Sequence, residues 1–184
     1  IFSSFQHLYP HLDFYLYEGG SMAIREKLER DELDFGIVII SDASASLQLL
    51  PMSRNQIMAC IPEKHPLAAH QSISINDIAN ADLIMLKEGS FLRQLVLSKI
   101  KRANIAPEIV LESNQIETVK GLIASNVGIA FLLDFIAKGA PGIKAVPFDE
   151  PLYVDLGLAW KKDRYISNAA QSFIDFCRTT MQNG

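Results

Sequence analysis

The first forty residues alternate between helical and strand-like spacings of apolar positions. Residues 1–9 carry apolar side chains every three positions and are followed by Pro10, so they predict the end of a helix whose start lies upstream. Residues 13–17 are aromatic-rich and predict a strand, and residues 21–30 predict a charged helix after two glycines. Residues 34–40, DFGIVII, form a nearly unbroken apolar run, which is typical of a parallel strand covered on both faces.

Two proline-rich patches divide the rest of the chain. Residues 47–52 and 56–61 predict two further strands, and the sequence IPEKHPLAAH that follows interrupts regular structure. A second patch, residues 147–151, precedes a strand predicted at 154–160. We expect the chain to pass from one lobe to another at these patches.

Between the patches, the pattern switches three times from strand to helix. The predicted strands are residues 83–86, 108–112 and 128–132, and a helical pattern follows each of them. This order predicts a parallel sheet with helical crossovers. The last helix is the clearest, because apolar residues recur at three and four positions from Ile166 to Met181.

Composition restricts the classes of function. The chain has 184 residues, 49% of them hydrophobic, which is enough for one large domain or two small lobes. Its 21 acidic and 17 basic residues are spread without runs, so we expect no DNA binding by this segment itself. Cys60 and Cys177 fit no metal spacing and are expected to be buried, and no cofactor is predicted. No leader is visible and no apolar run approaches the roughly 18 residues of a membrane span, so we expect a cytoplasmic protein without membrane contact.

Three loops at the carboxyl ends of predicted strands carry polar residues. They are Ser41-Asp42, Gly89-Ser90 and Ser113-Asn114. In open parallel sheets, ligands bind at this edge. Ser90 is placed to cap the next helix, and Asn114 followed by Glu117 has the spacing of a capping box.

Two helix N-termini beside one crevice would bind a carboxylate, phosphate or sulfate. Arg93 lies in the first turn of its helix, where a cation is mildly unfavourable unless a negative group is close. A bound anion would supply that group. The alternative stays open, because Ser and Asn are the usual helix caps and an exposed arginine at this position costs only about a few tenths of a kcal/mol.

Catalytic interpretations find less support. The four histidines lie beside no recognisable nucleophile motif, and the chain contains neither a P-loop nor a GxGxxG sequence. No pair of carboxylates is placed as acid and base. We therefore predict a binding domain and not an enzyme.

Five segments in order resemble the effector-binding domain of LysR-type transcriptional regulators. They are YPHLDFYLYEGGS with LERDELDFGIVI, then IPEKHPLA, LIMLKEGSFLRQLV and SNQIETVKGLIASNVGIAFL. The resemblance implies an α/β fold with two Rossmann-like lobes joined by two crossover strands, like that of type II periplasmic binding proteins. Lobe I would be residues 1–61 plus 148–184 and lobe II residues 62–147, with the first strand of lobe I missing from this chain.

The resemblance also implies a function and partners. The three loops would line an effector cleft, with Arg93 beside them, and Phe91 and Phe131 would help to shape its pocket. The effector would be a small organic anion, most simply a carboxylate metabolite, and DNA binding would belong to an N-terminal domain absent from this chain. Two copies would form a homodimer, with residues 13–17 and 21–30 of lobe I against residues 115–125 of lobe II in the partner, and the full-length protein would be a tetramer. The alternative is a solute-binding protein, or a small-molecule enzyme, of the same fold.

Overall fold

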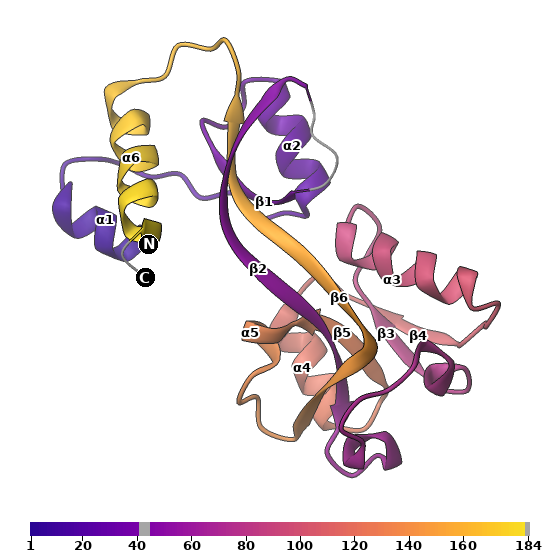
Figure 1. The fold of residues 1–184 in the computed structure, drawn as a ribbon. Coiled ribbons are helices and arrows are strands. Elements are labelled where there is room, and N and C mark those ends of the chain that lie inside the picture. The colour runs from indigo at the N-terminus through magenta and orange to yellow at the C-terminus, as the bar shows by residue number, and fades with distance from the viewer. Residues whose placement is uncertain (41–44, 183–184) are drawn as a thin grey trace. The chain divides into compact units, whose positions relative to one another are not determined.

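The computed structural model describes residues 1–40 and 45–182, which form two compact units. Unit 1 comprises Ile1–Ser53 and Asp155–Gly184, and unit 2 comprises Arg54–Val154. Two long strands, β2 (Leu47–Pro62) and β6 (Ile143–Lys161), pass from one unit to the other (Figure 1). The lobe boundaries expected at the proline-rich patches stay a prediction.

The remaining elements belong to one unit each. Unit 1 contains α1 (Phe2–Leu8), α2 (Ser21–Glu29), β1 (Gly36–Ile40) and α6 (Asn168–Gln182). Unit 2 contains η1 (Pro66–Ala69), η2 (Ile75–Ile78), β3 (Leu83–Met85), α3 (Phe91–Arg102), β4 (Ile109–Glu112), α4 (Ile116–Ala124), β5 (Ile129–Leu133) and α5 (Asp134–Ala137).

The strands follow the order β1-β6-β2-β5-β3-β4. Strand β3 is parallel to both β4 and β5, which confirms the predicted parallel arrangement with helical crossovers. The predicted parallel direction of residues 34–40 is wrong for the neighbour that the structure shows, because β1 pairs antiparallel with β6. A continuous apolar run reports burial and carries no information about the direction of the neighbouring strand.

Two predicted interruptions are absent. Residues 47–52 and 56–61 belong to one continuous strand, β2, and β6 runs without a break through Pro147 and Pro151. Proline lacks an N–H group but is tolerated in a strand wherever that group would face away from a partner. The described pairing of β6 with β1 begins only at Asp155, so both prolines lie outside it.

The strand predicted for residues 13–17 is also wrong. The segment has no regular secondary structure, and no described strand pairs with it. Aromatic content predicted a strand, but a strand also needs a neighbour to satisfy its backbone groups. Tyr15 and Leu16 are exposed, and the segment borders an open groove of about 420 Å³ whose other wall includes Phe35, Gly36 and Ile37.

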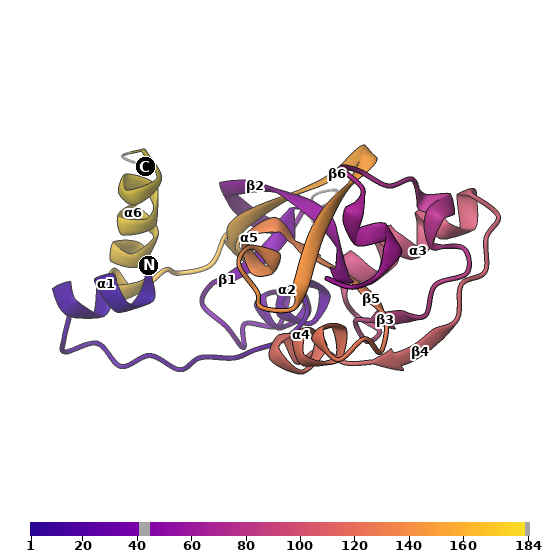
Figure 2. The same cartoon turned by 90° about the horizontal axis from the view of Figure 1, so that it is seen from below.

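An aromatic cluster joins α1 to α6 in unit 1. Figures 1 and 2 show the two helices packed together at the chain ends. Phe5 and Phe173 are buried, with ring centroids 5.0 Å apart in an edge-to-face arrangement. Phe35, just before β1, stacks on Phe173 at 4.3 Å, so the cluster also ties the helices to the sheet.

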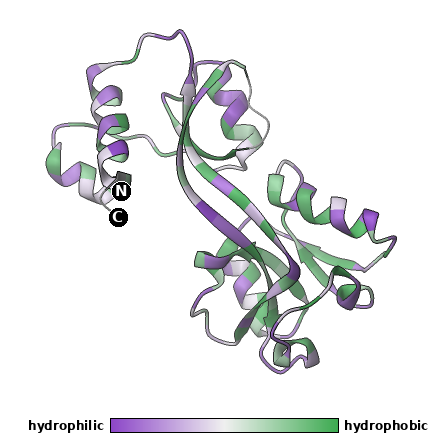
Figure 3. Cartoon of the chain, in the orientation of Figure 1, coloured by the Kyte–Doolittle hydropathy of each residue, from purple (hydrophilic) through white to green (hydrophobic). Residues whose placement is uncertain are grey.

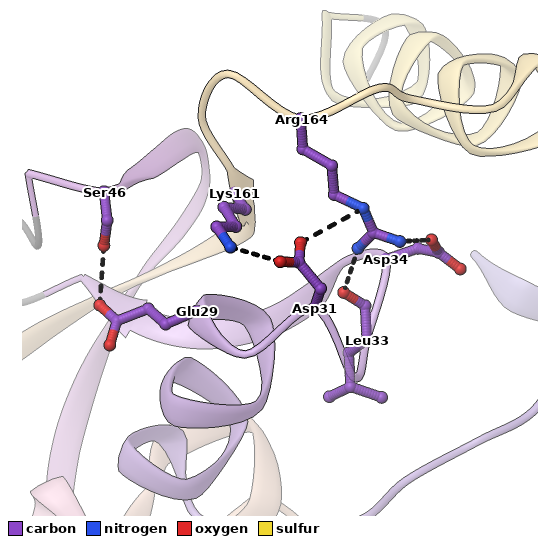
Figure 4. A network of polar contacts seen from close by, with 7 residues as sticks. All are labelled: Glu29, Asp31, Leu33, Asp34, Ser46, Lys161 and Arg164. Atoms are coloured by element: carbon purple, nitrogen blue, oxygen red, sulfur yellow. Dashed lines mark hydrogen bonds and ion pairs between the residues drawn. The ribbon is translucent and has the colours of Figure 1, made fainter.

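A polar network fastens the end of β6 to the turn between α2 and β1 (Figure 4). Asp31 lies in that turn and has a left-handed backbone conformation (φ 61°). Its carboxylate pairs with Lys161, and its Oδ1 lies 3.6 Å from the Arg164 Nε. Arg164 also donates to the Leu33 carbonyl and pairs with Asp34, each at 2.9 Å. Because these side chains are partly or largely exposed, the network fixes the position of the chain after β6 but adds little to the free energy of unfolding.

The core of unit 2 lies between α4 and the middle strands. Val119 and Ile123 of α4 pack with Ile84 of β3 and Leu132 of β5, and Figure 3 shows these strands as almost wholly hydrophobic. Cys60 belongs to this core, and burial raises the pKa of its thiol to about 12. Cys177 is buried in unit 1, and burial raises its pKa as well. Both cysteines are free and buried, as the sequence predicted.

Gly128 occupies a tight approach between β3 and β5. A Cβ atom there would lie 2.6 Å from the Asp82 carbonyl oxygen, which accepts a hydrogen bond from the Ile129 N–H. We expect Gly128→Ala to lower the free energy of unfolding by about 1–3 kcal/mol, because the backbone must shift. Gly121→Ala is the control, since its Cβ in α4 would meet no atom within 4 Å. We expect that change to add about 0.5–1 kcal/mol. Urea titration measures both, and equal effects would contradict the proposed close contact.

Candidate functional site

The loops after β3 and β4 lie side by side at one edge of the unit 2 sheet. The two strands are parallel, so their carboxyl ends meet at this edge. The Ser113 N–H donates to the Met85 carbonyl at 3.0 Å, and the Lys87 N–H donates to the Asn114 Oδ1 at 2.9 Å. The structure therefore brings together the Gly89-Ser90 and Ser113-Asn114 loops, as expected from the sequence.

Helix α3 begins at Phe91 with Ser90 as its cap. The Ser90 Oγ accepts a hydrogen bond from the Arg93 N–H at 3.4 Å, which confirms the predicted cap. Gly89 has a φ of +86°, a conformation that glycine adopts without strain, and it turns the chain into the helix. With the Arg93 N–H bonded to the Ser90 hydroxyl and the Gln94 N–H to the Ser90 carbonyl, the first-turn N–H groups of Phe91 and Leu92 are the ones without an acceptor inside the helix.

The start of α4 differs from the prediction. Gln115 is its cap residue and makes no side-chain cap hydrogen bond, so Asn114 and Glu117 form no capping box. Asn114 is used between loops instead, through its bond to Lys87, and the Ser113 Oγ accepts from the Gln115 N–H at 3.1 Å. The capping box predicted from the spacing of Asn114 and Glu117 does not form, because the Asn114 side-chain oxygen accepts a hydrogen bond from the Lys87 N–H of the neighbouring loop.

Arg93 has a negative partner inside the chain. Its Nη1 lies 2.6 Å from the Oε1 of Glu112, the last residue of β4, and donates to the Leu86 carbonyl at 2.7 Å. The Arg93 side chain is 13% exposed, so this pair is stronger than a fully solvated one. Glu112 was not predicted as this partner from the sequence. Its position at the end of a predicted strand, next to the strand that leads into the Arg93 helix, could have indicated that the two side chains meet.

Phe131 lies in β5 beneath the loops. Its side chain is buried, and its ring stacks on Phe148 with centroids 5.9 Å apart. With Leu86 and Arg93 it lines a cavity of only about 10 Å³, which has room for no more than a water molecule. Phe131 and Arg93 therefore border the same small void in this structure.

The predicted site residues thus fall into three groups. Six of them gather at the loop edge of unit 2: Gly89, Ser90, Phe91, Arg93, Ser113 and Asn114. Phe131 lies behind that edge. Ser41 and Asp42 lie outside the described residues.

The groups at this edge are hydrogen-bond donors and charged side chains. The edge offers backbone N–H groups, the Ser90 hydroxyl and two cations, Arg93, which is paired with Glu112, and the exposed Lys87 of the first loop. Across residues 1–40 and 45–182, no three His, Cys, Asp or Glu side chains come together in a way that could hold a metal ion. In the same residues, every helix is too short or too polar to cross a membrane.

Comparison with known proteins assigns the family. The family described as LysR substrate binding domain matches residues 1–182. The chain belongs to this family.

Two regulators of Bacillus subtilis are among its relatives. The chain is 30% identical over 174 residues to the HTH-type transcriptional regulator YybE. The match covers 94% of this chain and 60% of YybE. The transcriptional dual regulator GltC of the same organism is 24% identical over 184 residues, with 96% and 60% covered. The domain thus spans about 60% of the length of these relatives.

Solved structures of the family show the same fold. The effector-binding domain of QuiR in complex with shikimate superposes with a TM-score of 0.85 at 25% identity, covering 99% of this chain and 88% of that one. The Synechocystis PCC6803 CcmR regulatory domain in complex with 2-PG gives a TM-score of 0.87 at 24% identity, covering 99% and 89%. The fold class inferred from the sequence is confirmed by these matches.

Proposed function

We propose that this chain is the effector-sensing part of a LysR-type transcriptional regulator and that it binds a small organic anion, most simply a carboxylate. The observation that carries the proposal is the hydrogen-bonded pair of loops at the carboxyl edge of β3 and β4. There the start of α3 presents N–H groups and the Ser90 hydroxyl. A helix N-terminus favours negative charge, and each hydrogen bond to a charged acceptor is worth about 1.5–3 kcal/mol.

Two similar structures that contain a bound ligand support an organic anion as the ligand class, although they do not identify the ligand of this chain. The QuiR domain was solved with shikimate, and the CcmR domain with 2-PG. Ser41 and Asp42 remain part of the proposed site, together with the unit 2 loops. The cleft between the two lobes would hold the ligand, as the family resemblance implies.

A catalytic role is not proposed. The loop edge has one partly exposed ion pair, Arg93 with Glu112, and the two other charged residues of the first loop, Lys87 and Glu88, are exposed to solvent. General acid–base catalysis would need a titratable group held against the substrate. The relatives named above are transcriptional regulators. A regulator needs only differential affinity of its effector for two conformations, and a coupling free energy of about 1–3 kcal/mol changes DNA occupancy several-fold or more.

The whole protein would work as an assembly in the cytoplasm. DNA would be bound by an N-terminal domain outside this chain. Exposed Tyr15, Leu16 and Met22, on residues 13–17 and α2, provide an apolar surface that we propose meets α4 of a second copy. Pairs of such dimers would form the tetramer of the full-length protein.

The groove of unit 1 has a role in the same proposal. It is bordered by residues 13–17, which lack a strand partner, and by the β1 end at Gly36 and Ile37. The resemblance leads us to expect a first strand of lobe I that this chain does not contain. We propose that this strand lies in the groove and pairs with the residues along its walls.

A thermal-shift screen of the purified chain tests the proposed ligand class. Shikimate, acetate, succinate and citrate are compared with the neutral methyl ester of shikimate. A ligand at about one hundred times its dissociation constant adds roughly 2.7 kcal/mol, which raises the melting temperature by about 5–10 °C for a chain of this length. We expect at least one acid to stabilise the chain and the ester to do nothing. Stabilisation by the ester as strong as by the acid would reject the anion proposal.

The sequence upstream of Ile1 separates the two functions that share this fold. A helix-turn-helix segment there supports the regulator. A secretion signal supports a solute-binding protein, which would deliver its ligand and bind no DNA.

A further inference from the structure

A second hollow lies in unit 2, and its lining shares no residue with the proposed effector loops. Its volume is about 290 Å³, and residues of η2, α3 and β6 line it. This volume lies at the lower end of the range found for small-molecule sites, roughly 300–1,000 Å³. Its apolar floor is made by Ile73, Phe148 and Leu152, all of them buried.

The floor is fixed by backbone hydrogen bonds. The Ile73 N–H donates to the Pro147 carbonyl at 3.0 Å, and the Asp149 N–H donates to the Ile73 carbonyl at 2.9 Å. These two bonds form an isolated parallel bridge between Ile73 and Phe148. Stacking of Phe148 on Phe131 holds the ring from the other side. The apolar surface is therefore formed before any ligand arrives.

The rim carries more negative than positive charge. Asp149 and Glu150 stand against a single cation, Lys99. Glu150 is 90% exposed and its Oε2 lies 3.5 Å from the Lys99 Nζ, so this pair is loose and solvated. Asp149 accepts a hydrogen bond from the Ser72 hydroxyl, and within the described part of the chain no cation forms an ion pair with it. One carboxylate is thus left without a counter-charge beside an apolar floor.

We propose that this hollow binds a small primary ammonium ion with an apolar body. The body would cover Ile73, Phe148 and Leu152, and the ammonium group would lie between Asp149 and Glu150 and share Glu150 with Lys99. An anion of the same shape would gain Lys99 but face two carboxylates. The proposal does not depend on the effector site, because it shares none of the loop residues and takes ligands of the opposite charge.

The test compares three probes that share a phenylethyl body and differ in the charge of the head group. They are phenethylammonium, 2-phenylethanol and 3-phenylpropionate, titrated into the isotopically labelled chain and followed by NMR. We expect saturable binding of phenethylammonium, with the largest shifts at the Ile73, Ile75 and Leu152 methyl groups and the Asn76 amide, and weaker binding of the other two. Tighter or equal binding of the alcohol or the acid would overturn the ammonium assignment, and shifts centred on other residues would overturn the location.

Variants separate this site from general attraction to an acidic protein. We expect the double variant Asp149→Asn, Glu150→Gln to weaken phenethylammonium binding about 3- to 5-fold, the range for exposed ion pairs. Glu117→Gln is the matched control, because Glu117 is also exposed in unit 2 and pairs with a lysine, Lys120, at 2.9 Å. That control should leave the affinity unchanged. Equal weakening by the control and the double variant would refute the site.

Discussion

Phe173→Ala should lower the free energy of unfolding by about 3–5 kcal/mol, the range for removing a buried aromatic ring. Phe173 is 1% exposed and lies at the centre of the unit 1 aromatic cluster. Its ring stacks on Phe35 at 4.3 Å and on Phe2 at 5.3 Å, and it meets Phe5 edge to face. Truncation removes all three ring contacts and leaves a cavity between α1, α6 and β1. Guanidinium titration followed by circular dichroism gives the size of the loss.

Phe135→Ala is the control for this prediction. Phe135 is 57% exposed on α5, so the same truncation should change stability by about 0.5 kcal/mol or less. A loss at Phe173 no larger than the loss at Phe135 would show that the cluster does not anchor α6 in solution.

Ser90→Leu should weaken binding of the organic anion about 10- to 100-fold, corresponding to the loss of one or more hydrogen bonds to a charged acceptor. The substitution removes the hydroxyl and places an apolar side chain over the first turn of α3. Its structural cost is the loss of a helix cap, about 1 kcal/mol, so the chain should stay folded. Calorimetric titration with the acid that gives the largest thermal shift measures the change.

The same substitution elsewhere on α3 serves as the comparison. Ser98 is exposed, and its hydroxyl donates to the Leu95 carbonyl at 2.7 Å within its own helix. We expect Ser98→Leu to bind the acid like the parent chain. A Ser90 variant that is folded and binds with parental affinity would place the effector away from the start of α3.

Patterns within one element were read correctly from the sequence. The three- and four-residue spacing between Ile166 and Met181 corresponds to α6, and Ser90 caps α3. The apolar residues next to Cys60 and Cys177 in the sequence predicted correctly that both are buried. These properties depend on neighbours along the chain, because helix periodicity and capping involve residues at most four positions apart.

Properties that need a partner from another element were not determined in this way. Residues 13–17 have the composition of a strand, but none of the strands that the structure describes pairs with them. Asn114 has the spacing of a capping residue, and the neighbouring loop takes its side chain. Pro147 and Pro151 look like breaks and lie inside β6.

The ion pair of the candidate site likewise combines a property set within one element with one set by the tertiary structure. The sequence by itself placed Arg93 in the first turn of a helix, where a negative group close by is mildly favoured. Only the tertiary structure decided that this partner is Glu112, because parallel pairing of β3 and β4 brings the end of β4 to the start of α3. Local spacing fixes which groups lack a partner, whereas the group that satisfies each of them depends on which strands become neighbours.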